Sequence, residues 1–409
     1  MWSCNRCSIL VGFFMAPALA ADPDPIFADG FDRTFLFEPF QGVAPAPADL
    51  AFSSRIDMVD LYVILDRSGS MAAEITAVKN NLATVVNHLG CEPIGSGDPE
   101  TCIPDLWAGA GTVGYSGSGI DAYRNWVDVQ PSPNFSGLPT TEPAGCCAEP
   151  LTFSVYATIT GYGGAAYGFA GVPTRASCAT SPAANAGYAA FGYPCFRQGA
   201  LPLVLLATDE QALSAGDTNK TPAWSTIVLP AMLERGARFI GILGSAYGVN
   251  TDTDLRTMAT DTGAVDSASA NAPLVFDGAG ANAATAIQNG VQTAVKGIPL
   301  RVRAVVEDDV ADAVDTIGAF VDHIETRQLG TAECAEGLSE DDSGSDGYPD
   351  RYSGVIPGTG VCWRVVPKAN TSVPATAASQ TFHATVRVTA DVDVALGSRD
   401  IYFLVPPQP

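Results

Sequence analysis

Three oxygen-bearing side chains alternate in a short loop after an apolar run of the sequence. The run, LYVIL, leads directly into Asp66, Ser68 and Ser70. A second apolar run, LPLVLLAT, is followed at once by a carboxylate, Asp209. Carboxylate and hydroxyl oxygens are the ligands that Mg²⁺, Ca²⁺ and Mn²⁺ prefer, whereas zinc and copper more often take His or Cys. Together the four residues are candidate ligands of a divalent cation.

The segments that must position these residues alternate between strand and helix patterns. Both runs are continuously apolar, as strands in the middle of a parallel sheet are. Apolar residues recur at helical spacing over 75–89, a third apolar strand is expected at 237–245, and helices are expected at 253–263 and 282–298. This alternation predicts a doubly wound, mostly parallel α/β sheet over residues 56–298. In such a sheet ligands bind beyond the carboxyl ends of the strands, where both carboxylates fall.

The stretch DRSGS, with TDE after the second run, resembles the metal-ion-dependent adhesion site (MIDAS) of von Willebrand factor A (VWA) domains. The resemblance covers most of residues 57–298. The stretches GYPCFRQGALPLVLLATDE and GARFIGILGS resemble secreted bacterial members with long Cys-bearing insertions. It implies a Rossmann-like sheet in which Ser68 and Ser70 touch Mg²⁺, or Mn²⁺ or Ca²⁺ in its place. It also implies that Asp66 and Asp209 act on the ion directly or through water.

One ligand departs from the pattern of the family. VWA domains usually supply a further threonine from a glycine-rich loop before another helix, and the stretch TGYGGAAYG is expected to place Ala165 there, with Thr160 nearby. The site would then lack one hydroxyl, and a water molecule would fill the gap. An alternative interpretation is a site without metal, in which Ser68 and Ser70 cap the following helix.

The expected function is divalent-cation-dependent protein binding or adhesion. An open position on the cation would accept an acidic side chain of a protein partner. The 44 acidic and 21 basic residues give a net charge of −23, which disfavours nucleic acid and anionic membranes as partners. The alternative function is a metal-free structural or assembly component of the cell envelope.

The beginning of the sequence has the features of an export signal. Residues 1–20 combine a basic start, a short apolar run and a small-x-small end, which is typical of a signal peptide. No later run is long and apolar enough for a transmembrane segment. Residues 21–55 are rich in Pro, Asp and Phe and are expected to form an extended leader. Within them, PIFADGFD resembles a stretch of some secreted Gram-negative proteins, which favours secretion, the periplasm or the cell surface.

Eight cysteines remain beyond the expected signal peptide. An even number of cysteines in an exported chain favours disulfides over metal or redox chemistry. Proximity in sequence favours three pairings: Cys91 with Cys102, Cys178 with Cys195, and Cys334 with Cys362. Cys146 and Cys147 are left either as a vicinal pair or as partners of other loops.

The last part of the chain, residues 299–409, has strand patterns. The segment TFHATVRVTADVDVAL alternates apolar and polar residues, which predicts a half-buried antiparallel strand and an immunoglobulin-like β-sandwich domain. An acidic loop, DDSGSDGYPD, places Asp342, Asp346 and Asp350 at three ligand positions of a calcium loop. Gly344 occupies a fourth position and cannot ligate, so a solvated turn is the alternative to a Ca²⁺ site.

Enzymatic motifs are not found in the sequence. Its three histidines, His88, His323 and His383, form no HExxH pattern. The stretch GYSGSG is close to a nucleophile elbow but lacks its second glycine and its strand-to-helix context. No phosphate-binding or dinucleotide-binding loop is present. The chain is therefore expected not to be an enzyme.

Overall fold

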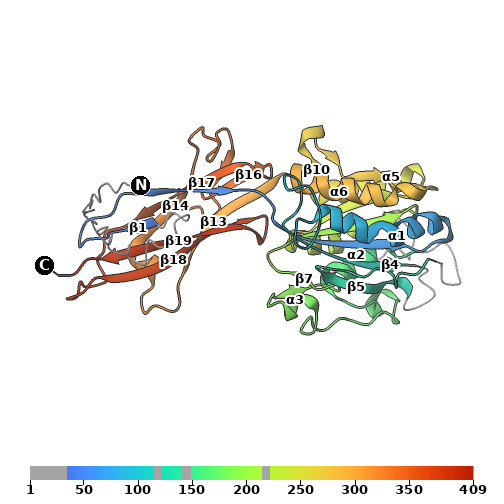
Figure 1. Cartoon of the computed structure of the whole chain (residues 1–409), viewed down its shortest axis with the longest axis horizontal. Coiled ribbons are helices and arrows are strands. Elements are labelled where there is room, and N and C mark those ends of the chain that lie inside the picture. Colours follow the sequence, from blue (N-terminus) through green and yellow to red (C-terminus); the bar gives the residue numbers. More distant parts are fainter. Residues whose placement is uncertain (1–34, 115–120, 141–148, 214–221, 409) are drawn as a thin grey trace, which may run out of the picture.

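Two parts of the molecule follow one another along its long axis (Figure 1). The computed structural model describes residues 35–114, 121–140, 149–213 and 222–408. One part combines a sheet with helices, and the other consists mainly of strands. The mixed α/β class expected from the sequence is therefore confirmed.

The helix-containing part has a six-stranded sheet in the order β12-β9-β8-β3-β4-β5. Neighbouring strands run parallel, except that β5 is antiparallel to β4. The strands are β3 (Met58–Asp66), β4 (Asp105–Val113), β5 (Arg124–Gln130), β8 (Leu201–Thr208), β9 (Arg238–Leu243) and β12 (Val275–Asp277). Strand β8 is buried throughout and β3 nearly so, as their continuously apolar sequences predict.

Helices pack on this sheet, and α1 contacts α6 while α2 contacts α4. They are α1 (Ala72–Leu89), α2 (Leu151–Thr160), α3 (Pro182–Asn185), α4 (Leu229–Glu234), α5 (Val249–Asp261) and α6 (Ala283–Gly297). The three helical patterns in the sequence correspond to α1, α5 and α6, and the apolar face predicted for α1 is buried. The sequence pattern did not reveal α2, because this helix is buried on almost every side and so lacks a polar face. Two short hairpins complete this part, β6 (Ala190–Phe191) with β7 (Phe196–Arg197) and β10 (Val265–Asp266) with β11 (Ala272–Pro273).

The second part contains a six-stranded sheet, in the order β1-β19-β18-β13-β16-β15, and a three-stranded sheet, β14-β17-β2. The two sheets meet where Tyr352 packs edge-on against Trp363, with ring centroids 5.3 Å apart. Besides helix α7 (Thr316–Phe320), its elements are β13 (Leu300–Asp308), β14 (Val321–Arg327), β15 (Ser339–Asp341), β16 (Arg351–Val355), β17 (Gly360–Pro367), β18 (Gln380–Ala390) and β19 (Val394–Val405). The alternation predicted for β18 is confirmed by its burial. Two such sheets suit a β-sandwich, and the immunoglobulin-like type stays a prediction.

Residues assigned to an extended leader contribute strands to the second part. β1 (Phe35–Phe37) pairs in parallel with β19, and β2 (Ala48–Ser53) pairs antiparallel with β17. The stretch 21–55 is therefore not only a leader, since its described portion belongs to both sheets. These strands are short and are separated by a proline-containing stretch, so no period shows in the sequence.

The three predicted disulfides are present: Cys91–Cys102, Cys178–Cys195 and Cys334–Cys362. Their Cα atoms lie 5.0, 5.7 and 5.2 Å apart, within the usual range. Cys146 and Cys147, like the expected signal peptide, lie outside the described residues. Disulfides persist in oxidising compartments, so the three bridges favour an extracellular or envelope location. In the described ranges no helix is both long and apolar enough to cross a membrane.

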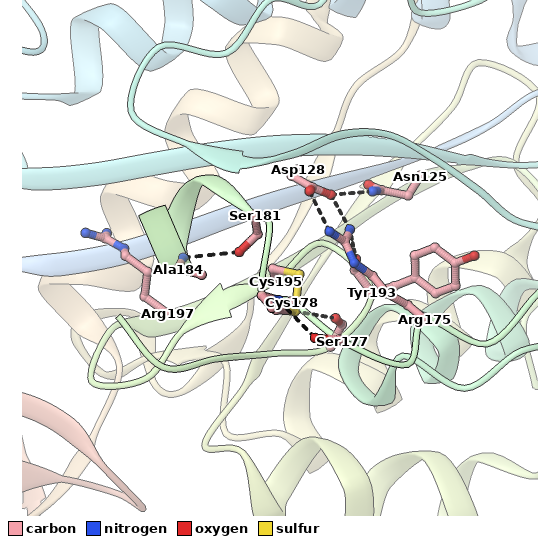
Figure 2. The surroundings of a disulfide bond; sticks show 12 residues. Asn125, Asp128, Arg175, Ser177, Cys178, Ser181, Ala184, Tyr193, Cys195 and Arg197 are labelled. Carbon is pink, nitrogen blue, oxygen red and sulfur yellow. Dashed lines mark hydrogen bonds and ion pairs between the residues drawn. A yellow bond between two sulfur atoms is a disulfide. The ribbon is translucent and has the colours of Figure 1, made fainter. Parts of the chain in front are cut away.

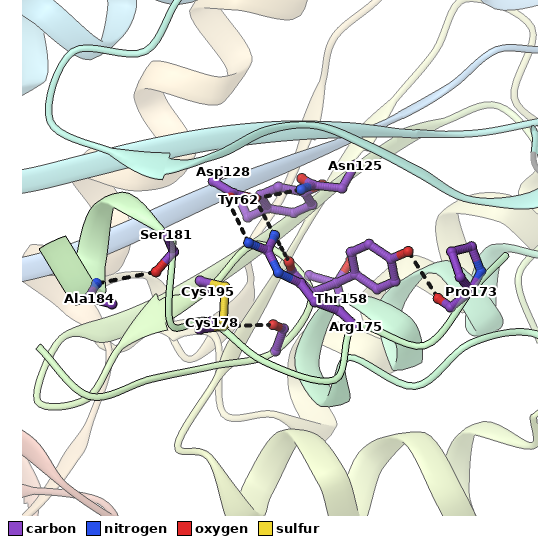
Figure 3. A network of polar contacts seen from close by, with 12 residues as sticks. Tyr62, Asn125, Asp128, Thr158, Pro173, Arg175, Cys178, Ser181, Ala184 and Cys195 are labelled. Atoms are coloured by element: carbon purple, nitrogen blue, oxygen red, sulfur yellow. Dashed lines mark hydrogen bonds and ion pairs between the residues drawn. A yellow bond between two sulfur atoms is a disulfide. The ribbon is translucent and has the colours of Figure 1, made fainter.

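A long Cys-bearing insertion, residues 161–200, lies between α2 and β8. Figure 2 shows its disulfide beside α3, whose first turn is capped by Ser181 accepting from the Ala184 amide at 3.2 Å. In Figure 3 the Arg175 guanidinium of the insertion donates to Asp128 of β5, with Nη2 2.8 Å from Oδ2. The insertion is thus cross-linked internally by its disulfide and attached to the edge strand β5 by the Arg175–Asp128 ion pair.

A buried arginine holds the same insertion against the beginning of the sheet. The side chain of Arg197 is fully buried, and its Nε donates to Asp60 of β3 at 2.8 Å. Its Nη1 forms an ion pair with Asp105 of β4 at 2.5 Å, and the guanidinium stacks over Trp107. Burial raises the pKa of Asp60 to about 6 against the attraction of Arg197. The arginine therefore compensates a carboxylate that is out of reach of water.

The turn between β18 and β19 contacts the α/β part. Arg238, the first residue of β9, forms an ion pair with Asp391 in this turn. The amide of Ala395 donates to the carbonyl of Gly199, which lies just before β8, at 2.9 Å. Both contacts are at the amino ends of the parallel strands. The second part is therefore attached to the sheet edge opposite the one expected to bind a ligand.

Candidate metal-binding site

The two strands that carry the candidate carboxylates lie side by side. Asp66 is the last residue of β3, and Asp209 directly follows β8. Because β3 and β8 are adjacent and parallel, both carboxylates lie at the carboxyl edge of the sheet. Ser68 and Ser70 lie in the connection from β3 to α1.

The structure brings the four predicted residues together. The Ser68 amide donates to Asp66 Oδ1 at 2.8 Å, and the Ser68 hydroxyl donates to Asp209 Oδ1 at 3.4 Å. The hydroxyl oxygens of Ser68 and Ser70 are 3.1 Å apart. Ser70 is exposed, whereas the other three residues are buried. The cluster is thus open to solvent on the side of Ser70.

The alternative interpretation of the two serines as helix caps is wrong in this structure. Ser68 precedes the 3₁₀ turn η2 (Gly69–Met71), and its side chain accepts no capping hydrogen bond. Helix α1 likewise begins without a side-chain cap. The Ser68 hydroxyl is directed to Asp209 and Ser70 instead. Its orientation therefore suits an oxygen cluster better than a helix terminus.

Thr208 orients the Asp66 carboxylate and was not singled out from the sequence. Its hydroxyl donates to Asp66 Oδ2 at 2.6 Å and accepts from the Glu210 amide at 3.0 Å. The remaining oxygen, Oδ1, already accepts from Ser68. Thr208 ends the apolar run LPLVLLAT and begins the stretch TDE. This position was the signal available in the sequence, since a threonine beside a buried carboxylate can donate to it.

Glu149 is a second residue that sequence reasoning missed. It lies just before α2 and is only 3% exposed. The pKa of Asp66 is raised to about 8, mainly by burial and also by the charges of Glu149 and Asp209, against the hydrogen bonds of Thr208 and Ser68. Glu149 is thus a buried acidic side chain whose charge acts on Asp66.

The glycine-rich stretch does not lead into a helix in the way the family pattern requires, and the role of Ala165 stays a prediction. Ala165 begins the 3₁₀ turn η4 (Ala165–Tyr167), which follows α2, and its side chain is exposed. Glu149 precedes α2, whose ten residues span about 15 Å. Gly161, with a φ of 78°, ends this helix, so the glycine-rich stretch follows a helix rather than preceding one. Glu149, not Ala165, therefore lies where the chain enters a helix.

The side chains present fit a hard cation. Two carboxylates and two hydroxyls offer only oxygen atoms, as Mg²⁺, Mn²⁺ and Ca²⁺ prefer. Within the described ranges no three side chains among His, Cys, Asp and Glu are already arranged to hold a metal ion. A cation here would therefore combine carboxylates with hydroxyl groups or water.

The acidic loop of the second part closes on itself through hydrogen bonds. Asp342 accepts from the Gly347 amide at 2.9 Å, and Asp346 accepts from the Tyr348 amide at 3.0 Å. Asp350 accepts from the hydroxyl of Ser343 at 2.6 Å. These contacts describe a folded acidic turn, and calcium binding by the loop stays a prediction.

If the loop binds calcium, Ca²⁺ should protect the segment between Cys334 and Cys362 from proteolysis. The ion would take the carboxylate oxygens and hold the turn closed, whereas a solvated turn gains nothing from Ca²⁺. Limited proteolysis followed by mass spectrometry, in Ca²⁺ and in EDTA, measures the difference. Equal cleavage under both conditions would leave only the solvated turn, and Glu340→Gln, at an exposed position just before the loop, serves as the control.

The histidines do not assemble a catalytic group in the described chain. His88 is exposed on α1. His383 lies between Asp309 and Asp400, each 3.1 Å from a ring nitrogen. Most of the stretch GYSGSG lies outside the described residues.

Comparison with protein-family models and with curated proteins finds no match. Solved structures do match. A von Willebrand factor type A protein from Catenulispora acidiphila aligns with 90% of this chain and 76% of its own, at 13% identity and a TM-score of 0.36. A VWA protein is thus among the solved structures that match this chain.

Two further solved structures have different roles. The pilus adhesin SpaC from Lactobacillus rhamnosus GG, in its open conformation, matches 91% of this chain at 11% identity and a TM-score of 0.31. This chain spans 47% of SpaC, or about half of its length. The human COPII-coat protein Sec24c matches 89% of this chain and 46% of its own, at 8% identity and a TM-score of 0.29. None of these likenesses assigns a role to a residue of this chain.

Proposed function

We propose that this chain is an exported, non-enzymatic protein that binds another protein through a divalent cation. The cation, Mg²⁺ or in its place Mn²⁺ or Ca²⁺, is held by Asp66, Ser68, Ser70 and Asp209. It keeps one position for an Asp or Glu carboxylate of the partner. This arrangement lets a chain of net charge −23 bind an acidic side chain that its surface otherwise repels.

The observation that carries the proposal is the pair of buried carboxylates at the carboxyl edge. In the part of the chain that the structure describes, Asp66 accepts only from Ser68 and Thr208, and Asp209 only from Ser68. No basic side chain is paired with either carboxylate there. Buried carboxylates are normally paired with a cation or coordinate a metal. The exposed Ser70 beside them leaves a side on which a partner can approach.

A second candidate function is a metal-free structural or assembly component of the cell envelope. A specific observation favours it: the pKa of Asp66, raised by burial to about 8, keeps this group largely protonated at neutral pH. A neutral Asp66 held by Thr208 needs no cation. The two functions therefore differ in whether a divalent ion replaces the proton.

The test is capture of partners from envelope or host extracts by the immobilised exported chain, with Mg²⁺ and Ca²⁺ or with EDTA. We expect capture of a defined partner that EDTA abolishes. Ser68→Ala should lose the capture, because it removes a hydroxyl from the cluster. Thr76→Ala, which removes an exposed hydroxyl bonded only within α1, should keep it.

The outcome separates the two candidate functions. Capture that EDTA and Ser68→Ala leave unchanged would overturn the cation-dependent function and favour the assembly component. Binding of the purified partner, measured in the same two conditions, distinguishes an effect of the ion on this chain from an effect on the extract.

A further inference from the structure

We infer that His383 is the centre of a pH-sensitive switch in the second part of the molecule. Its protonated imidazole holds residues 309–313, in the connection between β13 and α7, against strands β18 and β19. Loss of the proton releases this connection from the two strands. The inference goes beyond the proposed function, because the candidate metal-binding site lies in the other part of the molecule.

The imidazole of His383 joins three segments of the second part. His383 lies on β18, and its Nδ1 is 3.1 Å from Asp309 Oδ2 in the connection. Its Nε2 is 3.1 Å from Asp400 Oδ1 on the neighbouring strand β19. The ring stacks on that of Tyr402, also on β19, with the centroids 4.9 Å apart. This stacking fixes the plane of the ring, so both nitrogens face carboxylates at the same time.

Only a protonated ring satisfies both carboxylates. A neutral imidazole has one N–H group, and its other nitrogen carries a lone pair. In that form one nitrogen would face a carboxylate oxygen with no proton between them, and the two lone pairs would repel each other. The imidazolium donates from both nitrogens, to Asp309 and to Asp400. The contacts in the folded chain are therefore those of a charged His383.

Several carboxylates surround this single imidazole. The titratable side chains around it come from the connection and from β19, since α7 contains none. They are Asp309, Asp312, Asp400 and Tyr402. On β13, Glu307 pairs with Arg387 and Asp308 accepts from the Thr316 amide, so no other basic side chain on β18 is free to replace His383. Loss of the proton leaves the two carboxylates beside the ring without a cation between them.

The connection is attached to the sheet in part through His383. The amide of His383 donates to Asp312 Oδ2 at 3.3 Å, next to the ion pair between its ring and Asp309. Both aspartates also accept backbone amides from within the connection, which keep its turn folded. Val310, between them, is 93% exposed. Loss of the ring contact therefore frees the turn from the sheet while the turn itself persists.

The direction of the pH dependence follows from these contacts. Partial burial lowers the pKa of His383, but Asp309 and Asp400 outweigh burial and raise the pKa above its ordinary value of about 6.5. A group whose pKa is higher in the folded chain stabilises the folded contacts below its ordinary pKa. This stabilisation is lost as the pH rises through the raised value. The connection is therefore held under acidic conditions and released under alkaline ones.

Two measurements on the full exported chain, between about pH 5 and about pH 9, test the inference. Histidine NMR follows the ring of His383, whose signal is assigned with His383→Gln among the three histidines of the chain. Hydrogen exchange with mass spectrometry, corrected for the intrinsic effect of pH, follows residues 309–316. We expect the protection of this segment to fall about tenfold as His383 loses its proton, and that of α1 to stay constant.

Three variants separate the switch from a general effect of pH. Asp400→Asn should lower the pH at which His383 titrates by about one unit, because it removes one of the two carboxylates that favour the charged ring. The release of residues 309–316 should shift with it. Asp322→Asn, which removes an aspartate beside His323 instead, should shift neither. His383→Gln should leave the segment weakly protected at every pH.

The inference is wrong if protection of residues 309–316 stays constant while His383 titrates, or if His383 does not titrate in this range. It is also wrong if the change in protection persists in a folded His383→Gln chain. Circular dichroism checks that each variant is folded. Should His383→Gln not fold, Asp309→Asn and Asp400→Asn take its place, and a titration and release unchanged in both would overturn the inference.

Discussion

Asp209→Asn should lower the affinity of the chain for divalent cations by about tenfold or more, equivalent to about 1.4 kcal/mol. The substitution keeps an oxygen that can accept from the Ser68 hydroxyl, so the local hydrogen bond is retained. It removes one of the two charges closest to the ion, in a buried setting where charge interactions are strong. Calorimetry with Mn²⁺ and Ca²⁺ on the full chain measures the loss.

The matched control is Asp252→Asn, which removes the same charge from the surface of α5. Asp252 pairs with Arg256 one helical turn away, and its side chain is partly exposed. This variant should bind cations as the unaltered chain does. If both variants weaken binding equally, the effect is one of net charge, and Asp209 is not a ligand.

Arg197→Met should destabilise the α/β part by about 3–5 kcal/mol, the range observed when one partner of a buried ion pair is removed. The substitution leaves Asp60 fully buried without its guanidinium partner. It also removes the cation that stacks over Trp107. Denaturant unfolding followed by tryptophan fluorescence reports the change, because Trp107 lies at the affected position.

Two further variants show whether the buried charge causes this loss. Arg256→Met breaks an exposed pair and should cost less than about 1 kcal/mol. Adding Asp60→Asn to Arg197→Met should recover part of the stability, since the unpaired carboxylate is then neutral. A loss below 1 kcal/mol in Arg197→Met, with no recovery in the double variant, would contradict the role assigned to this ion pair.

The strands of the α/β part and the position of its candidate site could be predicted from local sequence. Asp66 and Asp209 each follow an apolar run, and the carboxyl ends of adjacent parallel strands meet at one edge. The positions of the Ser68 and Ser70 hydroxyls could be predicted together with that of Asp66, because both serines lie in the loop that follows it. Short cysteine loops likewise indicated the three disulfides.

The features of the fold and site that could not be predicted from the sequence depend on information that a local pattern does not contain. Helix α2 is buried on almost every side, so its start, just after Glu149, could not be located by periodicity. The glycine-rich stretch with Ala165 looked like the beginning of a helix, yet Gly161 ends one. The strands β1 and β2 are defined by pairing with segments more than 300 residues away, which no window of sequence contains.

The connections between the α/β part and the second part determine how a mechanical pull passes through the molecule. The candidate site lies at one edge of the α/β sheet, and Asp391 is attached to Arg238 at the opposite edge. A pull on the α/β part would pass into the second part through the chain itself, from β3 into β2 and from α6 into β13, as well as through these contacts. The hydrogen bonds between β13 and the antiparallel strand β18 lie across such a pull, so sliding β13 past β18 requires breaking many of them together. The arrangement resists tension along the long axis of the molecule.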